Sequence, residues 1–226
     1  MKYKLTNQDG CTAGDTQWGP GISHTAIGTG QQLCMAGWIH FYDSPLLAVL
    51  LNPLHANFDN PRFGNSSQRG NNSMSGESNL GAKQGTTIRE IDVPVVSLEQ
   101  RARFAILCAR EVYWEPSWCA WAEAWLTGAD RTAVAARTAS SNARLAWEGS
   151  ITYVVATAIA AIEAATEAAL LAGLAAIDAV EVFGIRAVTR APEAAAAAAE
   201  AAAVAHNRMS RGPLELVTLA ENACSM

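Results

Sequence analysis

The sequence changes character near Ser97, where a segment rich in glycine, proline, asparagine and aromatic residues gives way to one dominated by alanine. Alanine is the strongest helix former, but its methyl group buries little apolar area. Helices of this composition are expected to approach one another closely. The sequence therefore predicts an α+β protein, with a small β-rich domain over residues 1–96 and an alanine-rich all-α helical bundle over residues 97–226.

Turn-forming pairs such as Asp9-Gly10 interrupt the first domain and prevent long helices. We expect strands over residues 37–42 and 88–96, where apolar residues alternate with other side chains. Residues 62–85 are polar and nearly featureless, so they predict a long loop.

Prolines and capping residues mark the expected helix starts. Ser44 and Pro45 predict a short helix, which Pro53 should end. Ser97 and Gln100 form a capping box at the first helix of the second domain. About five more helices are predicted to start from Pro116 (ending at Gly128), Asp130, Ser150, Pro192 and Pro213.

Charge and cysteine usage restrict the class of protein. A net charge of −5, with 16% charged residues, argues against nucleic acid as the main partner. The five cysteines lack a CxxC pair, which favours free thiols in a reducing compartment. The N-terminus has no apolar segment typical of a secretory signal, and the apolar stretch 151–182 carries carboxylates that disfavour a membrane span.

A tryptophan stripe is expected on one side of a helix. Trp114, Trp118, Trp121 and Trp125 are spaced by four, three and four residues. The stripe suits either a stacking or sugar-binding platform, or a seam that clamps the helical domain onto the β-rich domain. We favour the seam, because large rings supply the burial that alanine cannot.

The helix after residue 150 is expected to have two different faces. Its acidic stripe, formed by Glu163, Glu167, Asp178 and Glu181, is either a solvated face or a partner of Arg137 and Arg144 on the preceding helix or on another copy. The opposite face carries small residues that would let a second helix approach closely, and self-association through such faces predicts a homo-oligomer. Its interface residues would be Ala161, Ala165, Ala168 and Ala172.

No metal, cofactor or catalytic residue is predicted. His24, His40 and His55 accompany Cys11 and Cys34 in the first domain, but their spacing matches no known zinc motif. Paired carboxylates at spacing four are typical of di-metal bundles, but the Glu-x-x-His motif that such bundles need is absent from the sequence.

Four motifs carry a family resemblance: residues 16–19 (TQWG), 33–40 (LCMAGWIH), 44–58 (SPLLAVLLNPLHANF) and 86–91 (TTIREI). With the alanine-rich tail, they resemble an uncharacterised family of tailed-phage proteins over roughly the first 130 residues. The resemblance is interrupted between Phe63 and Gly85, where we hypothesise a frame-shifted version of an ancestral hairpin. It implies a location in the host cytoplasm or the virion, and it implies no activity.

Two functions from different classes follow. The first is a phage-encoded, non-enzymatic structural or interaction protein that self-associates through its alanine-rich helices. The alternative is a nucleotide-binding, nucleotide-sequestering or ADP-ribosyltransferase-like protein, because residues 37–42 and the following helix are loosely similar to the glycine-strand-helix element of ADP-ribosyltransferases. In that alternative a small nucleotide would bind a pocket lined by His24, Trp38, His40 and Tyr42. The similarity lacks a suitably placed glutamate.

Overall fold

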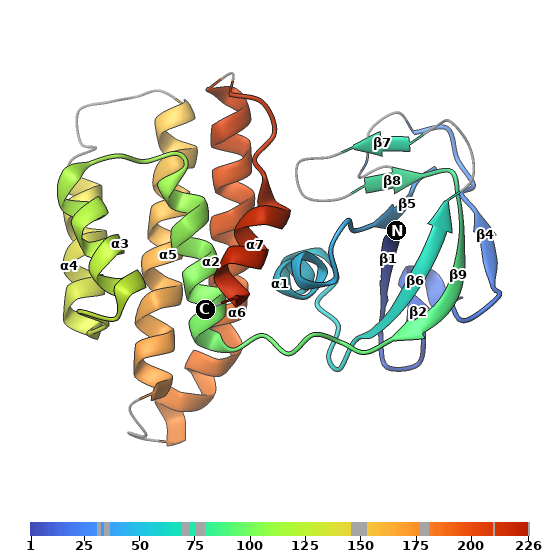
Figure 1. Ribbon diagram of the computed structural model, residues 1–226, viewed down its shortest axis with the longest axis horizontal. Helices are drawn as coiled ribbons and strands as arrows, with labels where there is room; N and C mark the ends of the chain where they lie inside the picture. The colour runs from blue at the N-terminus through green and yellow to red at the C-terminus, as the bar shows by residue number, and fades with distance from the viewer. Residues whose placement is uncertain are drawn as a thin grey trace. The chain divides into compact units, whose positions relative to one another are not determined.

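The computed structural model describes residues 1–30, 33, 37–68, 73–75, 80–145, 153–176, 181–209 and 211–225. The chain divides into two compact units, Met1–Val95 and Val96–Met226. Strands β1 to β9 and helix α1 belong to the first unit, and helices α2 to α7 belong to the second. Figure 1 labels these elements except β3. The protein is thus a mixed α+β protein.

The first unit contains a four-stranded antiparallel sheet in the order β1-β6-β9-β4. Its strands are β1 (Lys2–Thr6), β6 (Arg62–Gln68), β9 (Gln84–Ile91) and β4 (Ser23–Thr25). A second antiparallel sheet has the order β5-β8-β7, with β5 (Ile39–Phe41), β8 (Leu80–Ala82) and β7 (Ser73–Ser75). The short strands β2 (Cys11–Thr12) and β3 (Thr16–Gln17) pair across a 3-10 turn at Ala13–Asp15.

These two sheets join into a small barrel. Only Lys83 separates β8 from β9, so one extended segment belongs to both sheets. On the other side, β1 bridges to the residue after β5, because Tyr3 and Tyr42 exchange backbone hydrogen bonds of 2.9 Å in both directions. The strand circuit β1-β6-β9/β8-β5 therefore returns to β1.

The prediction of a long loop over residues 62–85 is wrong for the residues that the structure describes. The segment contains β6, β7, β8 and the start of β9. β6 lies between β1 and β9, and both neighbours bind its backbone. Backbone hydrogen bonds on two sides stabilise a strand regardless of how polar its side chains are, which a composition argument does not capture.

Two further expectations for the first unit need correction. β9 ends at Ile91, so the predicted strand 88–96 is too long at its C-terminal end. Helix α1 (Pro45–His55) begins as predicted, with Ser44 accepting a hydrogen bond from the Leu47 amide, but it continues past Pro53. A proline in the last turn removes only one donor, and the helix ends two residues later.

The second unit contains the helices α2 (Leu98–Arg110), α3 (Pro116–Thr127), α4 (Ala133–Leu145), α5 (Tyr153–Ala176), α6 (Glu181–Arg208) and α7 (Leu216–Cys224). The Ser97 capping box is confirmed, since Gln100 N donates to Ser97 Oγ and Ser97 N donates to Gln100 Oε1. Gly128 ends α3 at a φ of +80°, as predicted.

Three other predicted helix starts differ from the structure or lie outside it. Thr132, rather than Asp130, caps α4, because its Oγ1 accepts a hydrogen bond from the Ala135 amide. Pro192 lies inside α6 instead of starting a helix. Ser150 falls outside the described residues. The first error is a shift of two residues, since either of two neighbouring polar residues can cap a helix. The second arises because a proline, although frequent at a helix start, also occurs inside helices.

Alanine forms most of the core of the second unit. In Figure 1, α2, α5 and α6 run alongside one another, and each of these helices packs against the other two. α4 packs on α5, and α7 packs on α2.

Within the described part of the chain, no helix is long and apolar enough to cross a membrane.

Candidate functional site

The interior of the barrel contains a lysine. Lys4 lies in the middle of β1, is only 9% exposed, and donates a hydrogen bond from Nζ to the backbone oxygen of His40 at 3.0 Å. The same nitrogen lies 4.9 Å from the ring centroid of Trp18 and 5.5 Å from that of Phe41. Aromatic faces attract a cation, but they do not replace its lost hydration. Burial accordingly lowers the pKa of Lys4 from 10.5 to about 8.

Glycines on the neighbouring strands leave space for this interior. Lys4 pairs with Gly64 on β6, where a Cβ atom would come within 2.7 Å of Thr87 Cγ2. A Cβ atom at Gly85 on β9 would collide with the Phe41 ring. Because paired residues of adjacent strands face the same side of a sheet, the missing side chain at position 64 lets the Thr87 side chain lie on the same face as Lys4.

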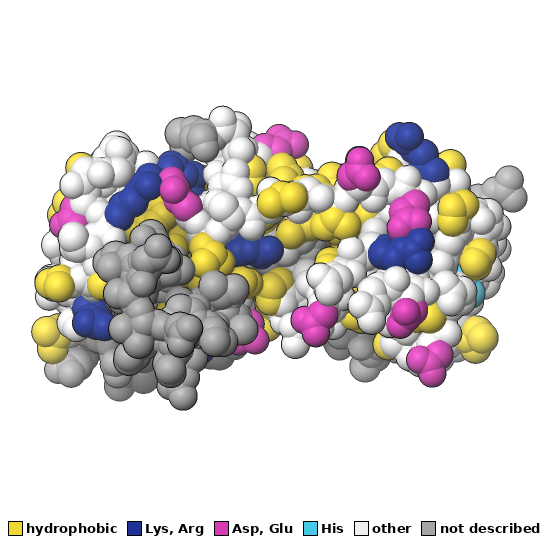
Figure 2. All heavy atoms as spheres, turned by 90° about the horizontal axis from the view of Figure 1, so that it is seen from below, with side chains coloured by type: hydrophobic (Ala, Val, Ile, Leu, Met, Phe, Trp, Pro, Cys, Tyr) yellow, Lys and Arg dark blue, Asp and Glu magenta, His cyan; other side chains and the backbone are white. Residues whose placement is uncertain are grey.

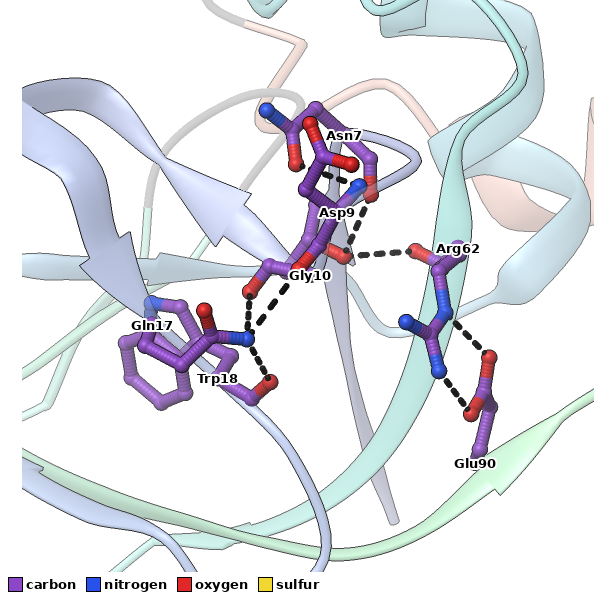
Figure 3. A network of polar contacts seen from close by, with 8 residues as sticks. Asn7, Asp9, Gly10, Gln17, Trp18, Arg62 and Glu90 are labelled. Atoms are coloured by element: carbon purple, nitrogen blue, oxygen red, sulfur yellow. Dashed lines mark hydrogen bonds and ion pairs between the residues drawn. The ribbon is translucent and has the colours of Figure 1, made fainter.

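The loop after β1 holds Trp18 through a network of hydrogen bonds (Figure 3). Asn7 Oδ1 accepts a hydrogen bond from the Cys11 amide at 2.8 Å, and the tight turn that follows places Gly10 at a φ of +79°. Gly10 O accepts from the Trp18 amide at 2.8 Å. The side-chain amide of Gln17 donates to the backbone oxygens of Gly10 and Trp18. These bonds hold Trp18 in one position.

An ion pair forms the outer edge of this site. Arg62 Nε and Nη2 donate to the two carboxylate oxygens of Glu90 at 2.6 and 2.5 Å (Figure 3). This hydrogen-bonded contact raises the pKa of Arg62 and lowers the pKa of Glu90. The two charges compensate each other at the surface, and Arg62 Nη1 takes no part in the pair.

A small cavity lies between these groups. Its volume is about 20 Å³, which is room for about one water molecule. The Oγ1 atom of Thr87, a residue that is 2% exposed, has no hydrogen-bond partner. The cavity is lined by Lys4, Thr6, Gly10, Trp18, Gly19, Pro20, Arg62, Phe63, Gly64, Thr87 and Glu90.

The four residues predicted for a nucleotide pocket do not converge. His24, on β4, packs its ring 4.5 Å from the Trp18 ring, and its Nε2 lies 2.7 Å from Gln17 O. Trp18 in turn meets Phe41 edge to face. His24 therefore packs against the Trp18 ring, but it does not line the cavity.

The other three predicted pocket residues lie on the opposite face of the β5 segment from Phe41. Trp38, His40 and Tyr42 alternate with it along the strand, and each side chain is engaged elsewhere. Trp38 Nε1 donates to Gly30 O at 2.9 Å, and His40 Nε2 lies 2.5 Å from Leu33 O. The Tyr42 hydroxyl lies 2.9 Å from His55 Nδ1.

Metal ligation finds no support in the described residues, where no group of three or more His, Cys, Asp or Glu side chains is placed to hold an ion. Cys11, Cys108, Cys119 and Cys224 are free thiols. Cys34, the fifth cysteine, lies outside the described residues.

The tryptophan stripe is part of the helical core. Trp118 is 0% exposed, Trp121 and Trp125 are also buried, and the rings of Trp118 and Trp121 lie 5.6 Å apart where α3 packs with α2 and α4. Trp114 is 52% exposed and stacks against the Arg211 guanidinium. The interface role predicted for the three buried rings is wrong, because their own unit covers them.

The predicted role of the alanine face of α5 as an interface between chains is also wrong. Ala161, Ala165, Ala168 and Ala172 are all buried in a single chain, on a helix that packs against α2, α4 and α6. The short side chains do permit close helix packing, but the helices that approach belong to the same molecule. On the acidic side, Glu167 pairs with Arg190 of α6 at 2.7 Å. The pairing of the acidic stripe with Arg137 and Arg144 stays a prediction.

Comparison with known proteins adds no relative, since no family model, curated protein or solved structure matches the chain.

The site around Lys4 was missed by sequence reasoning. Lys4 lies in the pattern Lys2-Tyr3-Lys4-Leu5, in which both lysines look like the polar face of a strand. Gly64, which pairs with Lys4, was a possible signal in the sequence. It could be recognised only by knowing which residues of β1 and β6 pair with each other.

Proposed function

We propose that the protein is a non-enzymatic structural or interaction protein of a tailed phage, located in the host cytoplasm or the virion. In this proposal the helices of the second unit form a bundle that acts as a rigid scaffold, and the small barrel is the interaction module. The resemblance of the first 130 residues to a tailed-phage family supplies the setting.

One observation supports this function over the nucleotide-binding alternative. The cavity beside Lys4 has room for about one water molecule, so it does not enclose a nucleotide. The residues suggested for a nucleotide pocket are instead bonded to backbone oxygens or to one another. Thermal-shift screening against NAD, ADP-ribose and cyclic nucleotides should leave the melting temperature unchanged, whereas a nucleotide-dependent rise would favour the alternative.

The surface charge fits a protein partner better than nucleic acid. Figure 2 shows acidic and basic side chains interspersed over the face that it draws, without an extended area of one sign. Non-specific nucleic-acid binding requires a continuous basic surface, and the net charge of the chain is −5.

Self-association remains part of the proposal, but it must use the exterior of the molecule. Light scattering with mass analysis at micromolar concentration tests it. A mass that is a multiple of 23.9 kDa supports a homo-oligomer, and a monomer would contradict self-association while leaving binding to another protein to be tested by pull-down with the barrel residues altered.

A further inference from the structure

We propose that the barrel opens along the seam between β1 and β5, and that the strand edges freed there pair with the same edges of a second copy of the chain. This inference names the surface behind the self-association proposed above, and it rests on that proposal. The opening itself is a property of one molecule, so it can be measured without the association.

The two edges of β1 are held unequally. On one side, β1 pairs with β6 at each residue from Lys2 to Thr6. On the other side, the bridge between Tyr3 and Tyr42 is isolated, with two backbone hydrogen bonds of 2.9 Å. An ion pair between Lys2 and Asp43 also crosses this seam, but both side chains are partly exposed, and such pairs contribute little. The seam is therefore the side on which β1 separates from its neighbour more easily.

The backbone pairing stops one step beyond this bridge. The register of Tyr3 with Tyr42 places Leu5 opposite His40, and Leu5 directs its N–H and C=O to the same side as Tyr3, because strand residues alternate. No backbone hydrogen bond joins Leu5 to His40, both of which the structure describes. His40 O instead accepts a hydrogen bond from Lys4 Nζ at 3.0 Å. A side chain thus takes the place of a strand pairing.

The buried ammonium favours the open seam. Lys4 is 9% exposed and lies next to the rings of Trp18 and Phe41, and this burial lowers its pKa to about 8. The closed barrel holds the ammonium at a cost in hydration that one hydrogen bond and two rings offset only in part. Opening the seam returns the ammonium to water, which lowers the free energy needed to break the bonds between Tyr3 and Tyr42.

A second copy of the chain fits the freed edges. Each edge already has its complement in the closed barrel, where Tyr3 exchanges hydrogen bonds with Tyr42 and the positive Lys2 contacts the negative Asp43. Two opened copies related by a twofold axis can form these contacts twice between molecules, as in strand exchange. An unpaired strand edge is a template for such pairing. An unrelated strand would have to match both the register and the charges.

Hydrogen exchange of single amides tests the opening. The Tyr3 amide faces the seam, whereas the Lys4 amide, on the next residue of the same strand, faces β6. In the wild type at pH 7 we expect the amides of Tyr3 and Tyr42 to exchange at least about tenfold faster than that of Lys4, after correction for intrinsic rates. Lys4→Met should slow both seam amides several-fold, because no ammonium then gains hydration on opening. Equal rates in the wild type, or no slowing in Lys4→Met, would overturn the opening.

A disulfide across the seam tests the association. Lys2 lies opposite Asp43, next to the bridge, at a non-hydrogen-bonded pair whose Cα separation suits a disulfide. The oxidised double variant Lys2→Cys/Asp43→Cys should have the mass of a monomer in light scattering at concentrations where the wild type associates, and reduction should restore association. The wild type with and without reductant is the matched control, because it shows the effect of reduction on the native thiols.

The outcomes separate this inference from the function on which it rests. If the oxidised variant associates as the wild type does, pairing at the seam is overturned and self-association stands. A wild type that is monomeric throughout contradicts self-association itself, and the pairing with it. Should the double variant fail to fold, Lys4→Met decides the matter, because association as strong as that of the wild type would overturn the pairing.

Discussion

In the helical unit the core is lined by the methyl groups of alanine and by tryptophan rings, whereas the interior of the barrel buries the ammonium of Lys4, and glycines at positions 64 and 85 give room to the side chains of Thr87 and Phe41. The helical core gains stability from apolar burial and tolerates almost no change of volume. In the barrel, burial of the Lys4 ammonium away from water lowers stability. Small residues thus have opposite roles in the two units: alanines bring helix backbones together, and glycines make room for neighbouring side chains.

The largest effect is expected from removing a buried ring. Trp118→Ala should lower the free energy of unfolding by about 4 kcal/mol, because it leaves a large cavity in the helical core. Trp114→Ala, at a half-exposed position two residues before α3, should cost less than about 1 kcal/mol. Urea denaturation of both variants makes the measurement. Equal losses would mean that the stripe is not a core element.

A gain in the free energy of unfolding, rather than a loss, is expected from a substitution in the barrel. Lys4→Met keeps the length of the side chain and removes the buried charge, so at pH 7 it should stabilise the barrel by up to about 3 kcal/mol, the equivalent of the pKa difference between 10.5 and about 8. Lys2→Met should have little effect by comparison. Destabilisation by Lys4→Met would show that the ammonium is a net structural contributor.

The same site predicts a pH dependence. The folded-state pKa of Lys4 lies below its ordinary value, so folding releases a proton between about pH 8 and 10.5. Burial of the charged Lys4 side chain therefore lowers the free energy of unfolding by its full amount below about pH 8. This penalty shrinks as the pH rises and is gone above about 10.5. Subtracting the profile of Lys4→Met from that of the wild type isolates it, and a flat difference over this window would contradict the burial of the charge.

Overpacking tests the volume sensitivity of the helical core. Ala165→Leu should destabilise the protein by about 2 kcal/mol, because a larger side chain cannot fit where α5 meets its neighbours. Ala160→Leu, at an exposed position of the same helix, should change stability by less than about 0.5 kcal/mol. If the buried variant is as stable as the exposed one, the packing of α5 is looser than described.

The smallest effect is expected at the glycine beside Lys4. Gly64→Ala should cost about 1 kcal/mol, because the new methyl group meets Thr87 Cγ2. Thr87→Ser removes that methyl group, so the double variant should recover much of the loss in a double-mutant cycle. Additive losses would place the strain elsewhere.

The predictions from sequence succeeded where the signal is local. Ser97 with Gln100, and Gly128 after α3, specify helix ends through contacts within a few residues. They failed where distant segments decide. Residues 62–68 form a strand because β1 and β9 flank them, and Lys4 is buried beneath the rings of Trp18 and Phe41, which come from other segments. No window of the sequence contains both partners.

The closure of the barrel at Tyr3 and Tyr42 bears on the order in which the chain folds. The very first strand stays without its long neighbour until residues 62–68 have been made, and the circuit also needs the segment that ends at Ile91. Distant pairings of this kind slow folding. A nascent chain of this protein would therefore expose an unfinished strand edge during most of the synthesis of its first unit, which is the stage at which a chaperone has the most to protect.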